Sequence, residues 1–430
     1  MASTYLTRTP SSNGNRQVFT FSFWLKRTKL GSTQYFISQG SDNDNNFAMY
    51  FDANDHMGMW DYGSGYNWRY TTNRKFKDIN AWYHILLRAS TTDGTAQDRM
   101  KLYINGVQET SFSTNTTASS SLNTHVNQSG NALKIGIYTS GSNYFDGLMS
   151  HFHLADGTAY EPSTFGETDS TTGEWKIKTS PSVSYGTNGF FILKDGNSVT
   201  DQSGQSNNLT VGGGTLTKSE DCPSNVFATF NPLDWENRNI ALTNGNGTAT
   251  NTDTANWQAK YAMSTLAMSA GKYYAEFKVG NIGTNQLYVA GVIAEPESQN
   301  INSSIGSFGL GLYSPGKIFN LGSEAQTSLG AIVADDIIGV AFDVTNGTLQ
   351  FYKNGSTIGS QITSIATAGK LWRFGVNGYD GTWVMHSNFG NGYFGTTAVS
   401  SAGTNASGNG IFEYDVPSGY TALSTKGLNE

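Results

Sequence analysis

Charge and cysteine are both scarce in this chain of 430 residues. Charged side chains make up only 14% of the sequence, against about 25% in typical soluble domains. The single cysteine, Cys222, excludes an internal disulfide and a zinc site built from cysteines. Lysine and arginine form no cluster and the net charge is −7, so we expect no nucleic-acid partner.

Long apolar segments are also missing. No run of about 18 apolar residues occurs, so the sequence predicts no membrane insertion. Residues 1–16 are polar, which predicts synthesis in a cytoplasm without a secretory signal peptide. No heptad repeat predicts a coiled coil, so a homo-oligomer would form through sheet edges or termini. Residues 1–16 are a candidate arm that docks onto another subunit.

Glycine and aromatic residues are plentiful instead. Glycine occurs 50 times, and aromatic residues are 13% of the chain. Glycine supplies tight turns, while tyrosine, phenylalanine and tryptophan suit half-buried strands. The chain also exceeds the length of one ordinary hydrophobic core. We therefore predict an all-β protein of two or three domains with a polar, uncharged exterior.

The clearest local pattern is DDIIGVAFDVTNGTLQFYKNG, at residues 335–355. It contains two Asn-Gly pairs next to alternating apolar runs. Such pairs predict β-hairpins, because a type I′ turn needs positive φ at both central residues. The ending FYKNG at 351–355 is paralleled by LYING at 102–106. We interpret the chain as two antiparallel β-sandwiches, each containing one such hairpin.

The first half of the chain carries a family resemblance. Residues 17–25 alternate like a sandwich strand. Four segments then follow in the order FTFSFWLK, AWYHILLRAS, LYINGV and YFDGLMSHFHLADG. This order resembles the laminin-G-like, concanavalin A-like jelly roll over about residues 17–160. The resemblance implies an antiparallel jelly-roll sandwich.

The second half resembles another family. GKYYAEF at 271–277, DIIGVAFD at 336–343, the hairpin that follows and NFG at 388–390 are similar to the SPRY domain. We therefore expect five segments in the chain. They are an N-terminal arm (1–16), a laminin-G-like jelly roll (17–165), a partly extended connector with a few strands (166–235), a SPRY-like β-sandwich (236–395) and a C-terminal tail (396–430).

The ends of these domains resemble virion proteins of tailed phages, especially marine and cyanobacterial ones. The similar segments are YLTRTP at 5–10, EPSTFGET at 161–168 and VPSGYTAL at 416–423. The resemblance implies a location in the virion and contacts with other virion proteins. It favours a fibre, knob or surface appendage that contacts host-surface glycan or a receptor protein. The alternative is a head or tail decoration or scaffold protein that binds only other virion proteins.

Enzymatic activity is not expected. Retaining glycan hydrolysis needs two carboxyl groups about 5–5.5 Å apart. The Glu-x-Asp-x-x-Glu strand pattern usual for hydrolases of this fold does not occur. No Gly-x-Ser-x-Gly elbow and no Walker-type loop is present either. A glycan depolymerase is therefore the least favoured hypothesis.

An aromatic cluster is the main candidate for ligand binding in the first domain. It comprises Trp60, Tyr62, Tyr66, Trp68 and Tyr70, around a predicted hairpin tip. Aromatic rings suit sugars, which present one apolar face and a rim of hydroxyl groups. The alternative is that Trp60 and Trp68 are cross-strand partners in the core.

Three further aromatic residues, Tyr313, Tyr379 and Trp383, lie near loops that SPRY proteins use for peptide recognition. The alternative is that they are ordinary loop residues. Calcium is a candidate cofactor, for which Asp42, Asp44 and Asp52 are candidate oxygen ligands. Loops rich in aspartate and asparagine also form plain turns, so that interpretation stays open.

Overall fold

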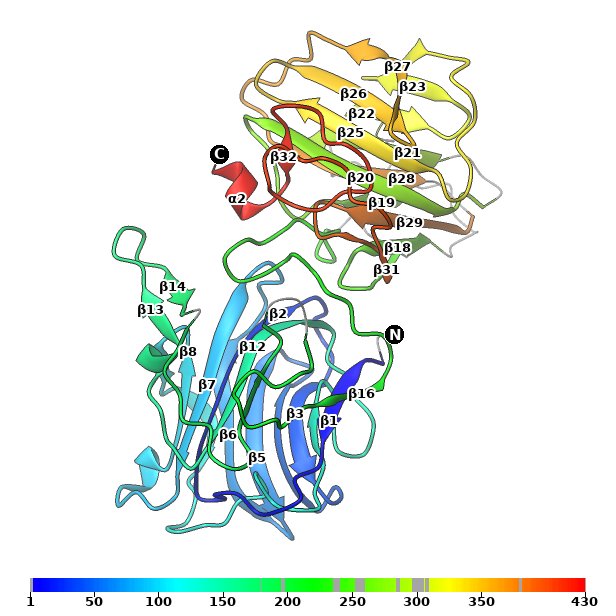
Figure 1. Cartoon of the computed structure of the whole chain (residues 1–430). Coiled ribbons are helices and arrows are strands. Elements are labelled where there is room, and N and C mark those ends of the chain that lie inside the picture. The colour runs from blue at the N-terminus through cyan, green and yellow to red at the C-terminus, as the bar shows by residue number, and fades with distance from the viewer. Residues whose placement is uncertain are drawn as a thin grey trace. The chain divides into compact units, whose positions relative to one another are not determined.

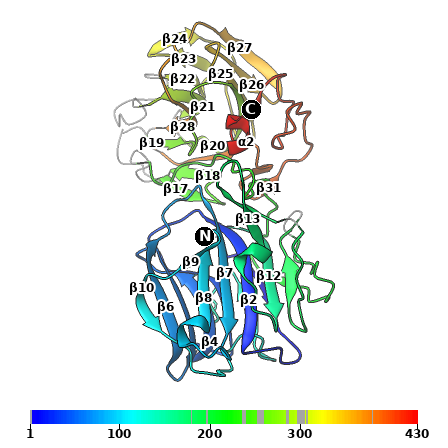
Figure 2. The same cartoon turned by 90° about the vertical axis from the view of Figure 1, so that its left-hand side faces the viewer.

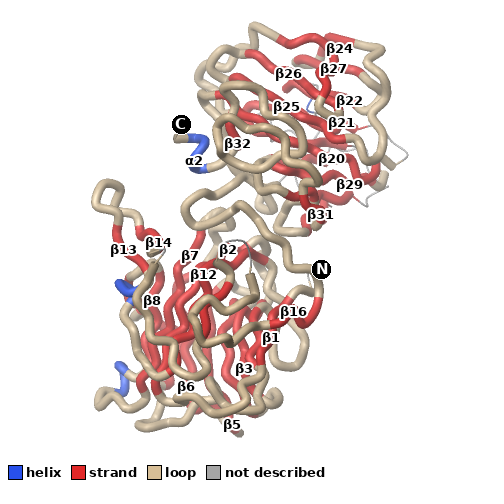
Figure 3. Tube along the Cα trace, in the orientation of Figure 1, coloured by secondary structure: helices blue, strands red, loops and turns tan. Residues whose placement is uncertain are grey.

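The all-β prediction is confirmed by a computed structural model (Figures 1 and 3). The structure describes residues 3–178, 180–194, 198–234, 240–251, 260–283, 287–295, 305, 309–378 and 381–429. Within these ranges no helix is long and apolar enough to cross a membrane. The chain divides into unit 1, Met1–Lys218 with Cys222–Ser224, and unit 2, Ser219–Asp221 with Asn225–Glu430.

Unit 1 contains an eight-stranded antiparallel sheet, called here its front sheet. The strand order is β10-β6-β5-β4-β3-β11-β1-β16. The strands are β1 (Tyr5–Arg8), β3 (Gln34–Gly40), β4 (Asn45–Phe51), β5 (His56–Gly63), β6 (Tyr66–Lys75), β10 (Phe112–Thr116), β11 (Leu133–Ile135) and β16 (Thr210–Gly213).

The back sheet of unit 1 has six strands in the order β15-β12-β2-β7-β8-β9, most of which are labelled in Figure 2. They are β2 (Val18–Arg27), β7 (Trp82–Ser90), β8 (Met100–Ile104), β9 (Val107–Glu109), β12 (Gly147–Asp156) and β15 (Phe190–Ile192). The alternation predicted for residues 17–25 is present, because Phe19, Phe21, Phe23 and Leu25 all enter the core between the sheets. Burial of each such side chain contributes about 1.5–3 kcal/mol.

The N-terminal segment differs from the predicted arm. Tyr5–Arg8 forms β1, which lies between β11 and β16 in the front sheet of its own unit. Leu6 is buried in the core. The sequence 1–16 looks polar because β1 is short and only Leu6 faces inward. The backbone of Tyr5–Arg8 is therefore already paired on both sides within its own unit.

The predicted connector is largely part of unit 1. β15 extends the back sheet beside β12, and β16 pairs with β1 at the edge of the front sheet. Before β15 in the sequence, a hairpin of β13 (Gly166–Thr168) and β14 (Trp175–Ile177) covers the outer side of the back sheet through Trp175. These pairings are non-local, so the local pattern did not show them.

The back sheet of unit 2 has eight strands. Seven of them follow the order β17-β18-β29-β20-β25-β26-β27, and β32 pairs in parallel with β20. Its strands are β17 (Ile240–Thr243), β18 (Thr248–Asn251), β20 (Lys272–Asn281), β25 (Ile337–Asp343), β26 (Thr348–Lys353), β27 (Ser356–Ile362), β29 (Trp383–Asn388) and β32 (Thr421–Ala422). Its six-stranded front sheet has the order β19-β28-β21-β22-β23-β24. Those strands are β19 (Lys260–Met263), β21 (Leu287–Ala294), β22 (Gly309–Tyr313), β23 (Lys317–Asn320), β24 (Ser323–Gln326) and β28 (Trp372–Gly378).

The two units repeat one topology. In the front sheets, β6-β5-β4-β3-β11-β1 corresponds to β24-β23-β22-β21-β28-β19, in matching chain order. In the back sheets, β12-β2-β7-β8-β9 corresponds to β29-β20-β25-β26-β27. Positions in the two units can therefore be compared strand by strand.

The two predicted Asn-Gly hairpins occupy equivalent turns of this topology. Asn105 and Asn354 both have φ of 49°, and each is followed by a glycine with positive φ, as the type I′ turn requires. The Asn105 side chain accepts the His84 amide at 2.8 Å, and the Asn354 side chain accepts the Ile337 amide at 2.8 Å. Each turn is thus hydrogen-bonded to the strand before its hairpin, β7 in unit 1 and β25 in unit 2.

The C-terminal tail is packed onto unit 2 rather than hanging free. β32 pairs with β20, and Phe412 is buried in a cluster with Tyr274. The Glu276 carboxylate accepts the backbone amides of Glu413 at 2.8 Å and Tyr414 at 2.9 Å. A buried carboxylate therefore anchors the tail to the back sheet.

Candidate functional site

Six aromatic side chains gather on the outer side of the front sheet of unit 1. Successive side chains on a strand alternate between faces. Phe47 and Met49 on β4 enter the core, so Ala48 and Tyr50 point outward. The outward set, called here the aromatic face, comprises Tyr35, Tyr50, Trp60, Tyr62, Tyr66 and Tyr138.

The rings of the aromatic face are packed on one another. Ring centroids are 5.0 Å apart for Tyr35 and Tyr50, 4.7 Å for Tyr50 and Trp60, and 4.3 Å for Tyr35 and Tyr138. Gly58 lies opposite Tyr50 on β5, and a Cβ there would come 2.2 Å from the Tyr50 ring. The glycine thus lets the Tyr50 ring lie flat on the sheet.

Exposure differs across the aromatic face. Tyr35, Tyr50 and Trp60 are only 8–9% exposed, whereas Tyr66 is 46% exposed. Tyr62 and Tyr138 are partly exposed. Burial raises the pKa of the Tyr35 and Tyr50 hydroxyls, which therefore stay neutral. The buried rings form a base, and Tyr62, Tyr66 and Tyr138 are the rings of this face that reach solvent.

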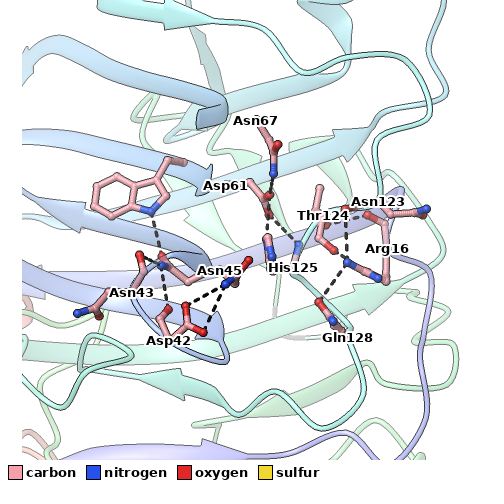
Figure 4. A network of polar contacts seen from close by, with 12 residues as sticks. Arg16, Asp42, Asn43, Asn45, Asp61, Asn67, Asn123, Thr124, His125 and Gln128 are labelled. Atoms are coloured by element: carbon pink, nitrogen blue, oxygen red, sulfur yellow. Dashed lines mark hydrogen bonds and ion pairs between the residues drawn. The ribbon is translucent and has the colours of Figure 1, made fainter. Parts of the chain in front are cut away.

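A polar loop supports this base from one side. The Trp60 indole N–H donates to Asn46 Oδ1 at 3.0 Å. Asn46 in turn donates from Nδ2 to the backbone carbonyls of Asp42 at 3.1 Å and Asn43 at 2.8 Å (Figure 4). Asn46 is fully buried, and its hydrogen bonds connect the turn between β3 and β4 to Trp60.

Trp68 and Tyr70 do not belong to the aromatic face. Trp68 is fully buried in the core and lies opposite Asp61 in the β5–β6 register, while Trp60 lies opposite Arg69. The two tryptophans therefore lie on opposite faces of the same sheet. The predicted surface cluster is wrong for Trp68 and Tyr70, and the alternative of Trp60 and Trp68 as core partners is wrong as well.

A buried carboxylate beneath the hairpin tip was missed by the sequence analysis. Asp61 is fully buried and accepts the His125 backbone N–H at 2.7 Å and the Asn67 side chain at 2.7 Å. His125 Nδ1 lies 3.0 Å from the same carboxylate (Figure 4). Asp61 thus joins the loop around His125 to β5 and β6. An aspartate inside an apolar strand pattern was the available signal.

The three candidate calcium ligands are not gathered at one point. Asp42 and Asp44 precede β4 and Asp52 follows it, so the length of the strand, roughly 20 Å, separates them. Asp42 accepts the Asp44 amide at 2.8 Å, and Asp52 accepts the His56 amide at 2.9 Å. The described residues contain no group of three or more His, Cys, Asp or Glu side chains arranged to hold a metal. The prediction of one calcium site from all three is therefore wrong.

The candidate residues of unit 2 have different environments. Trp383 is 1% exposed in the core, so its prediction as a surface ligand residue is wrong. Tyr379 lies outside the described residues. Tyr313 is partly exposed on the outer side of the front sheet, where it packs against Tyr288 and Phe319.

This unit 2 triad occupies the positions of three rings of the aromatic face. Tyr288 pairs with Tyr313 as Tyr35 pairs with Tyr50, and a register shift follows in both units. On the next strand, Phe319 lies opposite Gly311, and Trp60 opposite Ala48. The same aromatic pattern therefore recurs on both front sheets.

On the back sheet of unit 1, a buried serine–histidine pair lacks the arrangement of a nucleophile and its general base. Ser22 Oγ is 2.8 Å from His84 Nε2, and the Trp175 indole N–H donates to His84 Nδ1 at 3.0 Å. A neutral imidazole that accepts at Nδ1 carries its proton on Nε2. Nε2 therefore donates to Ser22 and cannot remove its proton. Burial lowers the pKa of His84 to about 3, so it stays neutral.

Comparisons with known proteins agree with these two sandwiches. Residues 2–164 match the family model described as the concanavalin A-like lectin/glucanases superfamily, and residues 272–391 match that of the SPRY domain. Among curated proteins, none matches this chain.

Solved structures are similar at low identity. The SPRY domain of human HERC1 is 18% identical, covering 37% of this chain and 96% of its own, with a TM-score of 0.31. A heptameric SAP-like pentraxin from Limulus polyphemus is 17% identical, covering 45% of this chain and 89% of its own, with a TM-score of 0.29. From its two family matches, this chain carries a laminin-G-like, concanavalin A-like domain followed by a SPRY domain, a combination that suggests a binding module.

Proposed function

We propose that this chain is a non-enzymatic surface protein of a tailed-phage virion that contacts a host-surface glycan through the aromatic face of unit 1. The observation that carries the proposal is the set of six aromatic side chains on one outer sheet face. The apolar side of a sugar can stack on such rings. The hydroxyl groups of Tyr62, Tyr66 and Tyr138 can hydrogen-bond its rim.

The aromatic face is also preorganised. Its buried rings pack on one another, and Gly58 leaves room for the Tyr50 ring. Asn46 accepts a hydrogen bond from the Trp60 indole. Binding to rigid rings avoids a cost of about 0.5–1.5 kcal/mol for each side chain that would otherwise be immobilised. Modest affinity at one site is sufficient if many copies act together on a particle.

The virion assignment rests on sequence. Segments at 5–10, 161–168 and 416–423 are similar to those of phage virion proteins, and the low charge suits an exposed binding protein. In this proposal the chain contacts other virion proteins and forms a fibre, knob or other appendage. Peptides of this chain are expected in purified particles by mass spectrometry, and the isolated protein is expected to block adsorption to host cells.

Glycan binding is tested with the full chain on a broad glycan array. Tyr66→Ala is the first variant, since Tyr66 is the most exposed ring and its loss should leave the fold intact. Tyr393→Ala in unit 2 is the matched control. We expect Tyr66→Ala to weaken binding at least 5-fold and Tyr393→Ala to leave it unchanged. Failure of the intact chain to bind any glycan would rule out the proposal.

Activity is tested in the same preparation. If the chain is a depolymerase, it will release reducing sugar from host envelope polysaccharide. We expect no release, because the two buried groups with an enzyme-like setting serve the fold: His84 donates to Ser22, and Glu276 anchors the tail. Steady release of reducing ends that tracks the protein through purification would replace the binding role with a hydrolytic one.

A decoration or scaffold role is the second candidate, and exposed aliphatic residues on edge strands favour it. Val107 on β9 is 66% exposed and Val211 on β16 is 43% exposed. Both strands lie at sheet edges, where unpaired backbone groups can pair with another chain. Cross-linking of purified particles would distinguish the roles: cross-links from Tyr66 and its neighbours to another virion protein would favour the scaffold.

A further inference from the structure

Arg69 lies on the aromatic face and faces its rings. It sits on β6, directly opposite Trp60, and is partly exposed. Its guanidinium carbon is 4.7 Å from the centroid of the Tyr66 ring, a cation–π contact. It also hydrogen-bonds the Tyr50 hydroxyl. These are contacts to neutral aromatic side chains.

The other described arginines are engaged differently. Four form ion pairs with carboxylates: Arg27 with Asp55, Arg74 with Glu109, Arg88 with Glu161, and Arg373 with Asp234 and Glu295. Three bind backbone carbonyls: Arg8, Arg16 and Arg99. Arg69 has neither kind of partner within the described chain, and its buried Nε lacks a hydrogen-bond acceptor there.

Two aspartates at the front sheet accept hydrogen bonds from other groups. Asp52 acts on Tyr50 through its charge, but its Oδ1 accepts the backbone amides of Asn54 and His56 at 2.8 and 2.9 Å. Asp61 lies on the other face of the sheet and binds His125. Asp42 and Asp44 act through their charges on Tyr138 of the same face, but none of these carboxylates forms an ion pair with Arg69 among the described residues. A partly buried cation in this position favours an anion from outside the chain.

We infer that the glycan bound by the aromatic face is anionic, a sugar bearing a carboxylate, sulfate or phosphate group that Arg69 receives. The inference rests on the proposed glycan-binding function and adds the class of ligand. The sugar ring would lie against the solvent-accessible rings Tyr62, Tyr66 and Tyr138. The guanidinium would bind the anionic substituent by two parallel N–H···O bonds, a geometry that arginine offers and lysine does not.

The test uses the full chain and matched ligands. Oligogalacturonate is compared with its carboxyl-reduced neutral counterpart, and sulfated and phosphorylated glycans are compared with their unmodified forms. The variants are Arg69→Gln, Arg69→Lys and, as control, Arg74→Gln. Arg74 lies on the same strand and carries the same charge, but it is paired with Glu109. Thermal melting confirms that each variant is folded.

We expect the anionic form of at least one pair to bind at least 10-fold more tightly than its neutral form, with affinity falling as salt rises. Arg69→Gln should remove that preference, Arg69→Lys should retain part of it, and Arg74→Gln should change it less than 2-fold. The pair that responds identifies the anionic group as carboxylate, sulfate or phosphate.

Two results would overturn the inference, and they differ. If neutral glycans bind as well as anionic ones and Arg69→Gln has no effect, the anionic class is wrong while glycan binding stands. If no glycan of any class binds, the proposed function fails and this inference fails with it.

Discussion

The two front sheets place three aromatic rings at the same positions but surround them differently. Tyr35, Tyr50 and Trp60 in unit 1 correspond to Tyr288, Tyr313 and Phe319 in unit 2. Both triads pack on the outer side of a sheet whose inner side forms the core. The repeated topology therefore accounts for the equivalent positions of three rings in each unit.

The neighbours of the rings are what differ. Opposite Trp60 lies Arg69, without a carboxylate partner, whereas opposite Phe319 lies Glu324, which pairs with Lys317 at 2.6 Å. Opposite Tyr50 lies Gly58, whereas opposite Tyr313 lies Lys317. Ile305 is also buried against the unit 2 rings. The shared topology thus places the rings alike, while adjacent charge and space differ, and our proposal assigns anionic-glycan binding to unit 1 on that difference.

The largest expected effect separates the two triads directly. Trp60→Ala should weaken glycan binding about 30-fold, because it removes the buried ring on which the exposed Tyr66 packs, and loss of a central tryptophan is typically worth about 2 kcal/mol or more. Phe319→Ala, at the equivalent position, should change binding less than 2-fold. Isothermal titration with the best array ligand measures both, with melting curves as the folding control. Equal losses in the two variants would mean that both faces contact the ligand.

The back sheets should respond to pH in opposite directions. Burial lowers the pKa of His84 to about 3, so the stability that neutral His84 contributes to unit 1 is lost as pH falls below 6.5. Burial raises the pKa of Glu276 to about 7 from 4.5, so its contribution to unit 2 is present below pH 4.5 and lost as pH rises to 7. Each effect amounts to about 2 kcal/mol over 1.5 pH units inside its window.

Urea-gradient proteolysis at pH 5 and pH 6.5, with fragments assigned to each unit by mass, measures this contrast. Glu276→Gln should flatten the pH response of unit 2 and leave that of unit 1 unchanged. A response of unit 2 that survives Glu276→Gln would assign the effect to other groups.

Filling the space beside Gly58 should have a smaller effect on stability and binding. In Gly58→Ala the new methyl group would overlap the Tyr50 ring, costing about 1 kcal/mol or more in unfolding free energy. It should also weaken glycan binding by displacing the ring. Gly94→Ala is the control, because nothing lies within 4 Å of a Cβ there. If Gly58→Ala melts and binds like Gly94→Ala, the flat Tyr50 ring is not needed.

The smallest effect is expected at the position in unit 2 that corresponds to Arg69. Glu324→Gln removes an exposed ion pair with Lys317, which is worth less than about 0.5 kcal/mol. Glycan affinity should stay within 2-fold of that of the intact chain. A clear loss of affinity would show that the front sheet of unit 2 also takes part in recognition.

Much of the fold was readable from local patterns. The alternation of Phe19, Phe21 and Phe23 predicted a core strand, and the Asn105 and Asn354 turns predicted hairpins. The pairings of the segments named as an arm, a connector and a tail were not readable in this way. Their strands pair with partners far away in sequence, as β16 does with β1 and β32 with β20.

The candidate site was predicted only in part, because its residues depend on register. Trp60 and Trp68 were grouped by proximity in sequence, but Trp68 pairs with Asp61, which puts it on the core face. A shift of one residue in register exchanges the two faces of a strand. Tyr35, Tyr50 and Tyr138 come from other strands and loops, so no local segment could have shown that they join Trp60.

The amino-acid sequence by itself determined the strands, the Asn-Gly turns and the division into two sandwiches, because alternation and turn chemistry act between near neighbours. Only the tertiary structure decided which aromatic rings share a face and that Arg69 stands among them without a carboxylate. Those outcomes depend on strand pairing, which brings together residues that are distant along the chain.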